Sequence, residues 1–325
     1  MNRRRFVACS SIAAAASLVA VATGSAETYP SRRITLVVPY TAGSGFDTTA
    51  RMIGQKFSER SGQPVVVDNK PGASGALGAE VVATAPPDGY TLLLTGTPLT
   101  VSASLSKTFR VNPVTDLTPL GNVATSGLAL VVTPSFPATS LEELLALVRA
   151  RPGQFNYSSP GSGTLQHVGM ELFKLQLGLD VVHVPYRGAA SALTDLLTGQ
   201  VQFTFLPVHS ARPHVQSGKL RMLAVAGSKR SIFAPEVASL AELGYPSIDF
   251  ELWYGVFGPA NLAPPAVQLW EQELAAIAAM PDVKESLERQ GMAPAYWDAQ
   301  TTGARVRAEV ARWREVVDKA GIKPE

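Results

Sequence analysis

The chain has 325 residues, 46% of them hydrophobic and 17% charged, and its formal net charge is +2. An apolar share of this size is typical of a folded globular protein and excludes a mainly disordered chain. No run of lysine or arginine follows the first residues. Because nucleic-acid binding needs a clustered basic surface, the sequence also argues against a nucleic-acid partner.

Residues 1–26 have the pattern of an export signal. Basic residues precede the apolar stretch 12–21, and small residues lead to Ala26, near which we expect cleavage. Arg3 and Arg4 also fit a twin-arginine signal, so the general secretory route and the twin-arginine route both remain open. The only cysteine, Cys9, lies in this segment, so we expect no disulfide and no thiolate metal site in the mature chain. We expect a periplasmic protein without membrane spans.

Short β-branched runs alternate with amphipathic stretches from residue 34 onward. The runs predict buried strands at 34–39, 64–68, 90–95, 128–133, 155–158, 181–184, 201–205 and 220–226. The intervening stretches predict helices at 47–61, 141–150, 164–177 and 189–198, with a capping box from Ser140 to Glu143. This alternation predicts an α/β fold with parallel sheets covered on both faces.

Two longer β segments, 120–132 and 250–258, run on without a helix between their parts. Segments of this length can pass between two lobes of a protein. The chain then turns helical at 264–279, 282–290 and 301–320. The last of these helices has an apolar face, and we expect the C-terminal helices to pack back onto the first lobe.

Three loops rich in glycine and serine follow predicted strands and open predicted helices, at 39–47, 158–164 and 185–188. Ligands of open α/β sheets bind beyond the carboxyl ends of the strands, and a helix N-terminus favours an anion. Two such loops that face each other can hold a carboxylate from two sides. The alternative, that they are only helix caps and tight turns, remains open.

Other chemistry has weaker support. Gly43, Gly45 and Thr48, with Asp68 further on, match the dinucleotide-binding fingerprint only loosely, because its third position is not glycine or alanine. No nucleophile elbow occurs, and the four histidines lack the spacing of a metal site. We therefore predict no catalytic residue, metal or cofactor. His167 either lines a pocket or lies in the core, and Arg187 either meets a ligand carboxylate or forms a surface ion pair.

The order of motifs resembles a known family. The segments that carry the resemblance are 29–47, 66–73, 87–92, 156–167, 182–188, 193–201 and 218–221. In this order they resemble the Bug-type extracytoplasmic solute receptors of tripartite tricarboxylate transporters, over nearly the whole mature chain.

The resemblance implies a two-lobed periplasmic-binding-protein fold of type II, a Venus flytrap with two crossovers between the lobes. Lobe 1 would comprise residues 27–127 and 250–325, and lobe 2 residues 128–249. Carried over by position, the expected ligand contacts are Tyr40, Thr41, Gly43, Ser44, Gly45, Asp47, Ser159, Gly163, Thr164, His167, Tyr186, Gly188, Phe205 and Leu206.

Two departures from the family pattern bear on the ligand. The frequent Pro-Gly-Gly of the first loop is replaced by Ala42, Gly43 and Ser44, which adds a hydroxyl. Leu206 and Pro207 stand where some members carry an acid that could pair with an amino group. We therefore expect a mono- or dicarboxylate, aromatic acids included, rather than an amino acid.

The resemblance implies capture without a chemical step. The expected partners are a small carboxylate and the membrane permease of a tripartite tricarboxylate transporter, and we expect a monomer. Two alternatives remain open: a receptor that signals to a membrane sensor kinase, and an exported α/β enzyme.

Overall fold

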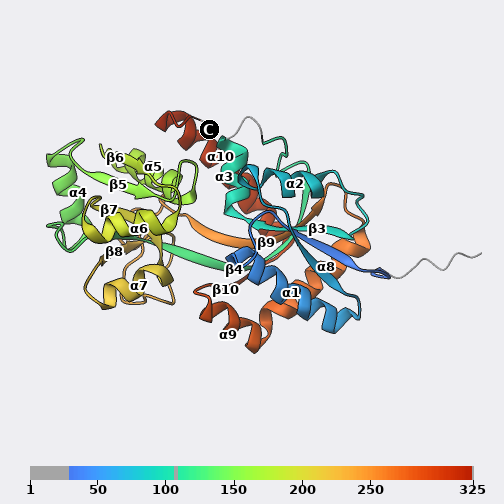
Figure 1. Ribbon diagram of the computed structural model, residues 1–325. Coiled ribbons are helices and arrows are strands. Elements are labelled where there is room, and N and C mark those ends of the chain that lie inside the picture. Colours follow the sequence, from blue (N-terminus) through green and yellow to red (C-terminus); the bar gives the residue numbers. More distant parts are fainter. Residues whose placement is uncertain (1–28, 106–108, 324–325) are drawn as a thin grey trace, which may run out of the picture.

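The computed structural model describes residues 29–105 and 109–323 and shows two lobes joined by long strands (Figure 1). The expected export signal, its cleavage near Ala26 and Cys9 lie outside the described residues. Within these ranges, no helix combines the length and apolar character needed to cross a membrane.

Lobe 1 is built on a sheet with the strand order β2-β1-β3-β9-β4, and β10 pairs with the other edge of β4. The strands are β1 (Ile34–Val38), β2 (Val65–Asn69), β3 (Thr91–Gly96), β4 (Leu117–Val132), β9 (Glu251–Pro259) and β10 (Ala293–Trp297). β1 is parallel to β2 and β3, whereas β9 is antiparallel to β3 and β4.

Lobe 2 uses the second part of β4 in a sheet with the order β6-β5-β7-β4, and β8 pairs with the other edge of β4. Its further strands are β5 (Asn156–Ser159), β6 (Val182–Pro185), β7 (Phe203–Pro207) and β8 (Arg221–Val225). β5 is parallel to β6 and β7, whereas β4 is antiparallel to β7 and β8.

The expectation of purely parallel sheets is therefore wrong at the junction of the lobes. β4 is antiparallel to every strand that pairs with it among the described residues. The cause is topological, because a chain that crosses to the second lobe and returns runs back along its first crossing. An apolar run buried on both faces looks the same in either direction, so the pattern carries no information on strand direction.

β4 is the first connection between the lobes. Its partner changes within two residues, since Gly127 pairs with Glu251 of β9 and Leu128 pairs with Pro207 of β7. The chain returns just before β9, where Phe250 packs in the lobe 2 core and Trp253 in lobe 1. The prediction that segments 120–132 and 250–258 link two lobes is thus confirmed by the fold.

The helices cover both faces of both sheets. Those predicted from the sequence are α1 (Gly45–Ser61), α4 (Leu141–Ala150), α5 (Leu165–Leu177), α6 (Ala189–Thr198), α8 (Pro264–Ala279), α9 (Pro281–Arg289) and α10 (Ala299–Ala320). The Ser140 hydroxyl accepts the Glu143 N–H at 3.2 Å, as the capping box predicts. In lobe 1, α1 and α8 pack on one face of the sheet and α2, α3 and α10 on the other.

Three helices were not predicted: α2 (Ala76–Ala83), α3 (Thr97–Leu105) and α7 (Val208–Gln216). They span eight or nine residues each, which is too short for a clear helical period. α7 also contains Pro213, a residue that normally argues against a helix interior. These short helices follow β2, β3 and β7 in the chain.

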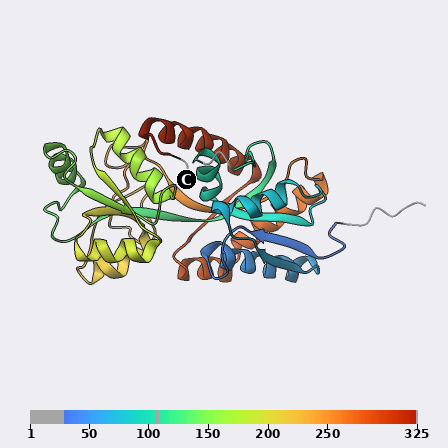
Figure 2. The same ribbon diagram turned by 45° about the horizontal axis from the view of Figure 1, so that its top comes forward.

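The C-terminal helix α10 does more than pack on lobe 1. Val306 and Val310 join the lobe 1 core beside Trp253, as expected. Trp313 and Val316, however, belong to the lobe 2 core. Figure 2 shows α10 lying across both lobes. The expected packing on the first lobe accounts for Val306 and Val310, and the contacts of Trp313 and Val316 make α10 a third link between the lobes.

Candidate ligand-binding site

The loop between β1 and α1 is held by hydrogen bonds among its own residues. Ser44 caps α1, since its hydroxyl accepts the Asp47 N–H at 3.3 Å. The Asp47 carboxylate accepts the Gly43 N–H at 2.8 Å. Gly45 and Phe46 begin the helix, where N–H groups have no acceptor within the helix. These two N–H groups, rather than that of Gly43, are the donors this loop offers to an anion.

Asp47 shapes this loop. It is buried, and its carboxylate accepts hydrogen bonds from Arg51 Nε and Asn69 Nδ2, each at 3.0 Å. Burial alone would raise the pKa of Asp47, but the hydrogen bonds from Arg51, Gly43 and Asn69 outweigh it and lower the pKa. An ionised Asp47 repels a carboxylate, so its contacts fit a positioning role better than direct ligand contact.

Tyr40 links the first loop to the junction of the lobes. Its hydroxyl lies 3.1 Å from Thr95 Oγ1, and its ring centroid lies 4.4 Å from that of Phe46. Phe46 in turn packs at 4.6 Å against Tyr254 of β9. Thr41 is exposed at the tip of the loop. The three rings form a continuous stack from the loop to a strand that joins the lobes.

The loop between β5 and α5 is built in the same way as the first. The Gly163 N–H donates to His167 Nδ1 at 3.0 Å, which repeats the bond from Gly43 to the side chain four residues later. The Ser159 hydroxyl accepts the Gly161 N–H at 3.2 Å. In both loops, therefore, a glycine N–H that the sequence assigned to the ligand is already bonded to a side chain.

The N-terminus of α5 has no side-chain cap. Thr164 occupies the N-cap position, but its hydroxyl donates to the Gly161 carbonyl at 2.8 Å and accepts no helix N–H. Leu165 and Gln166 open the helix, and their N–H groups have no acceptor within it. The uncapped helix start leaves donors and a partial positive charge for an anion.

Two histidines stack beneath this loop. The rings of His167 and His183 lie 4.0 Å apart, and Tyr157 stacks on the other side of His183 at 4.7 Å. His183 Nε2 lies 2.7 Å from the Ser159 hydroxyl. Burial, together with the electrostatic influence of neighbouring His167 and Lys174, lowers the pKa of His183 to about 3, so its ring is neutral.

His167 is itself buried, so the core interpretation left open by the sequence holds for its ring while its Nδ1 supports the loop. His183 and Tyr157 were not singled out by sequence reasoning. The pairing of β5 with β6 places them side by side, and this register is the signal that would have found them. Among the residues that the structure describes, no group of three His, Cys, Asp or Glu side chains could hold a metal ion.

The third loop, residues 185–188, is hydrogen-bonded to the second loop, residues 158–164. The Gly188 N–H donates to the Pro160 carbonyl at 3.0 Å. The Tyr186 hydroxyl donates to Asp195 at 2.6 Å, and burial together with Asp195 raises the pKa of Tyr186 to about 12. Arg187 is exposed and forms no ion pair with any described residue, so the surface ion pair considered from the sequence does not form.

Phe205 and Leu206 lie inside lobe 2. Phe205 is fully buried, with ring centroids 4.9 Å from Phe250 and 5.7 Å from Phe173. Leu206 is also buried and packs on the opposite face of the sheet. Their side chains thus belong to the two cores of lobe 2, on opposite faces of its sheet.

The N-termini of α1 and α5 both border the junction of the lobes, α1 from lobe 1 and α5 from lobe 2. A Cβ on Gly45 would lie 3.4 Å from the Tyr254 hydroxyl of β9. A Cβ on Gly163 would lie 3.0 Å from Leu105, the last residue of α3 in lobe 1. Figure 1 shows α1 in one lobe and α5 in the other. The second and third loops are joined directly, and the first loop belongs to the opposite lobe.

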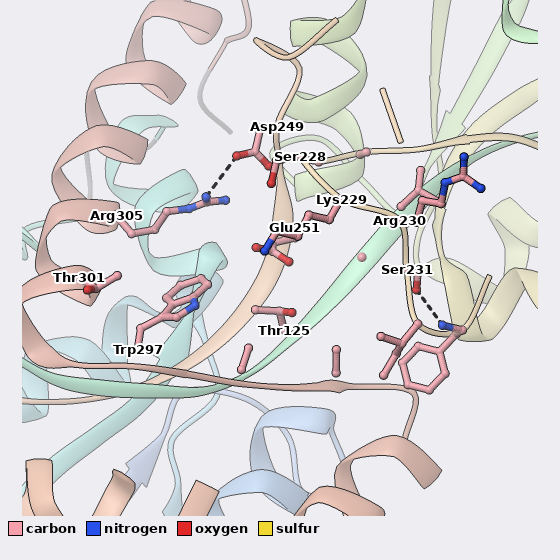
Figure 3. Close-up of a pocket in the computed structure, with 18 residues that line it drawn as sticks. Thr125, Ser228, Lys229, Arg230, Ser231, Asp249, Glu251, Trp297, Thr301 and Arg305 are labelled. Carbon is pink, nitrogen blue, oxygen red and sulfur yellow. Dashed lines mark hydrogen bonds and ion pairs between the residues drawn. The ribbon is translucent and has the colours of Figure 1, made fainter. Parts of the chain in front are cut away.

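A cavity of about 430 Å³ lies at the same junction, lined by Thr125, Glu251, Trp297 and Arg305 among others (Figure 3). No loop residue expected at the ligand site lines it. Thr125 and Ser126 are adjacent in β4, so their side chains point to opposite faces of the sheet and only that of Thr125 faces the cavity. Ser126 is the residue whose hydroxyl bonds to the Gly291 carbonyl, beside the first loop. We call this space the rear cavity.

The rear cavity carries both signs of charge, because Lys229, Arg230 and Arg305 line it together with Asp249 and Glu251. Arg230 is already paired with Glu242 at 2.9 Å. Arg305 is already paired with Glu309 at 2.7 Å and with Asp249 at 3.4 Å. Glu251 is half-buried, and its burial raises its pKa. An anion placed there would face both Asp249 and Glu251. The N-termini of α1 and α5, whose first N–H groups have no acceptor within the helix, are the better candidate site.

These features define a class of protein. Two α/β lobes joined by strands, with a helix N-terminus of each lobe at the junction, form the fold of periplasmic solute-binding receptors. The family model described as tripartite tricarboxylate transporter family receptor matches residues 49–322. The chain belongs to this family, which confirms the resemblance seen in the sequence.

Individual relatives agree over almost the full length. The chain is 35% identical to protein BugT of Bordetella pertussis, with 99% of each chain covered. The structure of R. palustris Rpa4515 with adipate is similar at a TM-score of 0.75 and 34% identity, covering 91% of this chain and 100% of that one. The structure of MatC from Rhodopseudomonas palustris with bound malate is similar at a TM-score of 0.71 and 28% identity, covering 89% and 100%.

Proposed function

We propose that this receptor captures a small mono- or dicarboxylate, aromatic acids included, between its lobes and delivers it to the permease of a tripartite tricarboxylate transporter. The observation that carries the proposal is the pair of helix starts at the junction, one in each lobe. The start of α5 is uncapped, and the start of α1 keeps two free N–H groups. No chemical step is part of this function.

The binding energy comes from charge-assisted hydrogen bonds. Each bond between a loop donor and a carboxylate contributes roughly 1.5–3 kcal/mol. Because the donors lie on two lobes, only a closed arrangement satisfies both sets. The ligand therefore favours closure by its higher affinity for the closed form. The proposed lobe limits are residues 27–127 with 250–325 for lobe 1, and 128–249 for lobe 2.

Two observations support a carboxylate without an amino group. Related structures hold adipate and malate, which are both dicarboxylates. In this chain Leu206 and Pro207 end β7, where no acid is available to pair with an ammonium group. We propose that the protein acts in the periplasm as a monomer, after cleavage near Ala26.

The experiment is isothermal titration of the purified mature protein with a panel matched in length. Adipate and malate are expected to bind, whereas 1,6-hexanediol, which has the carbon chain of adipate without its charges, is not. Aspartate and glutamate are expected to bind more weakly than the acids that lack an amino group. Binding of aspartate alone, or equal binding of diol and diacid, would contradict the proposal.

A pair of variants at one position isolates the N–H donor. Leu165→Pro removes the N–H at the first position of α5, where proline is tolerated, and the extended backbone of Thr164 suits a following proline. Leu165→Ala removes the same buried side chain but keeps the N–H. We expect adipate to bind Leu165→Pro about tenfold more weakly than Leu165→Ala. Equal affinities would show that this helix start does not hold the ligand.

A further inference from the structure

Tyr254 lies at the centre of the junction. It pairs with Gly96 of β3 on one side and with Ala124 of β4 on the other. Its N–H donates to Asn122 Oδ1 at 2.8 Å, and its ring packs on Phe46. The residue is 5% exposed. Strand pairing and packing on both sides therefore fix the position of the ring.

The hydroxyl of Tyr254 has no hydrogen-bond partner among the described residues, and burial alone raises its pKa to about 12. It is therefore a neutral donor at physiological pH. Buried tyrosine hydroxyls usually find a partner. Others in this chain do, as Tyr40 with Thr95, Tyr157 with Glu171 and Tyr186 with Asp195 show. The Tyr254 oxygen is not one of the fully buried atoms that lack a partner, so it reaches solvent at the junction and is open to a ligand.

The hydroxyl points toward the start of α1. A Cβ on Gly45 would lie 3.4 Å from the Tyr254 oxygen and 2.9 Å from Met292 Cε, so glycine lets both side chains pack against the start of α1. Gly45 and Phe46 are the first residues of a 17-residue helix, and their N–H groups have no acceptor within it. The Tyr254 O–H therefore lies close to the two residues that carry these N–H donors.

We propose that Tyr254 is a further ligand-binding and specificity-determining residue, whose hydroxyl donates to the carboxylate held at the start of α1. This inference rests on the proposed function of the same site. A phenylalanine at this position would leave an apolar floor with the same shape. The hydroxyl thus selects for an oxygen anion over an apolar group, and it does so from a strand that joins the two lobes.

The test is Tyr254→Phe, which deletes one oxygen and keeps the ring. Titration with adipate is expected to show binding about 10- to 100-fold weaker than wild type. The melting temperature of the unliganded protein is expected to stay unchanged, because no protein hydrogen bond is lost. The matched control is Tyr296→Phe, a half-exposed tyrosine of β10 on lobe 1, which is expected to leave adipate affinity unchanged.

The outcomes separate this inference from the function on which it rests. If wild type binds adipate and Tyr254→Phe binds it within twofold, the hydroxyl does not contact the ligand and the inference is wrong. If Tyr254→Phe loses affinity and also melts at a lower temperature, the hydroxyl has a structural role and the inference is likewise wrong. If wild type binds no carboxylate, the proposed function fails and this inference with it.

Discussion

Gly163→Ala is the substitution that most sharply tests the loop before α5. Gly163 has a φ of +77°, a left-handed conformation that costs an alanine about 1–2 kcal/mol. Its new Cβ would also lie 3.0 Å from Leu105, which must give way. Alanine also lowers the conformational entropy of the unfolded chain, which stabilises the folded protein by roughly 0.4–1 kcal/mol. We therefore expect a net loss of about 1 kcal/mol and a melting temperature lower by about 2–4 °C.

The matched control is Gly178→Ala at the other end of the same helix. Gly178 has a φ of +62°, and a Cβ added there would meet no atom within 4 Å. It carries the same backbone strain without touching the loop. Both variants are expected to lose similar stability in thermal melts, but only Gly163→Ala is expected to weaken adipate binding, because its strain displaces the Gly163 N–H and the helix start. Equal adipate affinity in the two variants would refute the assignment of this loop to the ligand.

Two further predictions concern buried polar groups. The pKa of His183 is about 3 in the folded protein against an ordinary 6.5. The unfolded chain therefore binds more protons between these values, and stability falls as the pH drops from 6.5 toward 3. Urea unfolding at pH 7, 6 and 5 is expected to show that the free energy of unfolding falls less with pH for His183→Gln than for wild type. Parallel plots of unfolding free energy against pH would contradict this. Glu309→Ala is expected to cost about 3–5 kcal/mol in urea unfolding, because Arg305 then lacks its buried partner. Glu315→Ala, which breaks an exposed pair with Lys319, is expected to cost less than about 1 kcal/mol, and a similar cost for both would contradict the buried network.

Much of the fold follows from local patterns. Helix α4 occupies Leu141–Ala150, the range that its apolar spacing and the Ser140 cap predict. The linking strands were visible as β segments too long for one sheet edge. Strand direction was not predictable, because apolar runs such as 128–132 are symmetric. The short helix α7 was hidden by Pro213, which sits in its last turns.

The course of α10 shows a second limit of sequence reasoning. Its apolar face is continuous from Val306 to Val317, so the periodicity predicts a buried face. Periodicity does not say which core covers which part of that face. Val310 meets lobe 1 and Trp313 meets lobe 2, although they are only three positions apart. A helix anchored in both cores must shift or bend when the lobes move, so we expect it to guide closure.

The site was predictable at the level of loops and not of atoms. Glycine-rich helix starts after strands identified both loops. The sequence did not show that Asp47 and His167 take up the N–H groups of Gly43 and Gly163. Those bonds depend on side-chain positions that only the fold supplies. Tyr254 was missed because it lies far along the chain in a strand, with no glycine or serine nearby on its N-terminal side to mark it.

The most direct measurement is a crystal structure of the protein with adipate bound. We predict one carboxylate at the junction, with oxygens about 2.7–3.2 Å from N–H groups at the starts of both α1 and α5. The lobes would be closed around it. Adipate in the rear cavity, or held by one helix start while the other faces solvent in a closed protein, would contradict the proposed site.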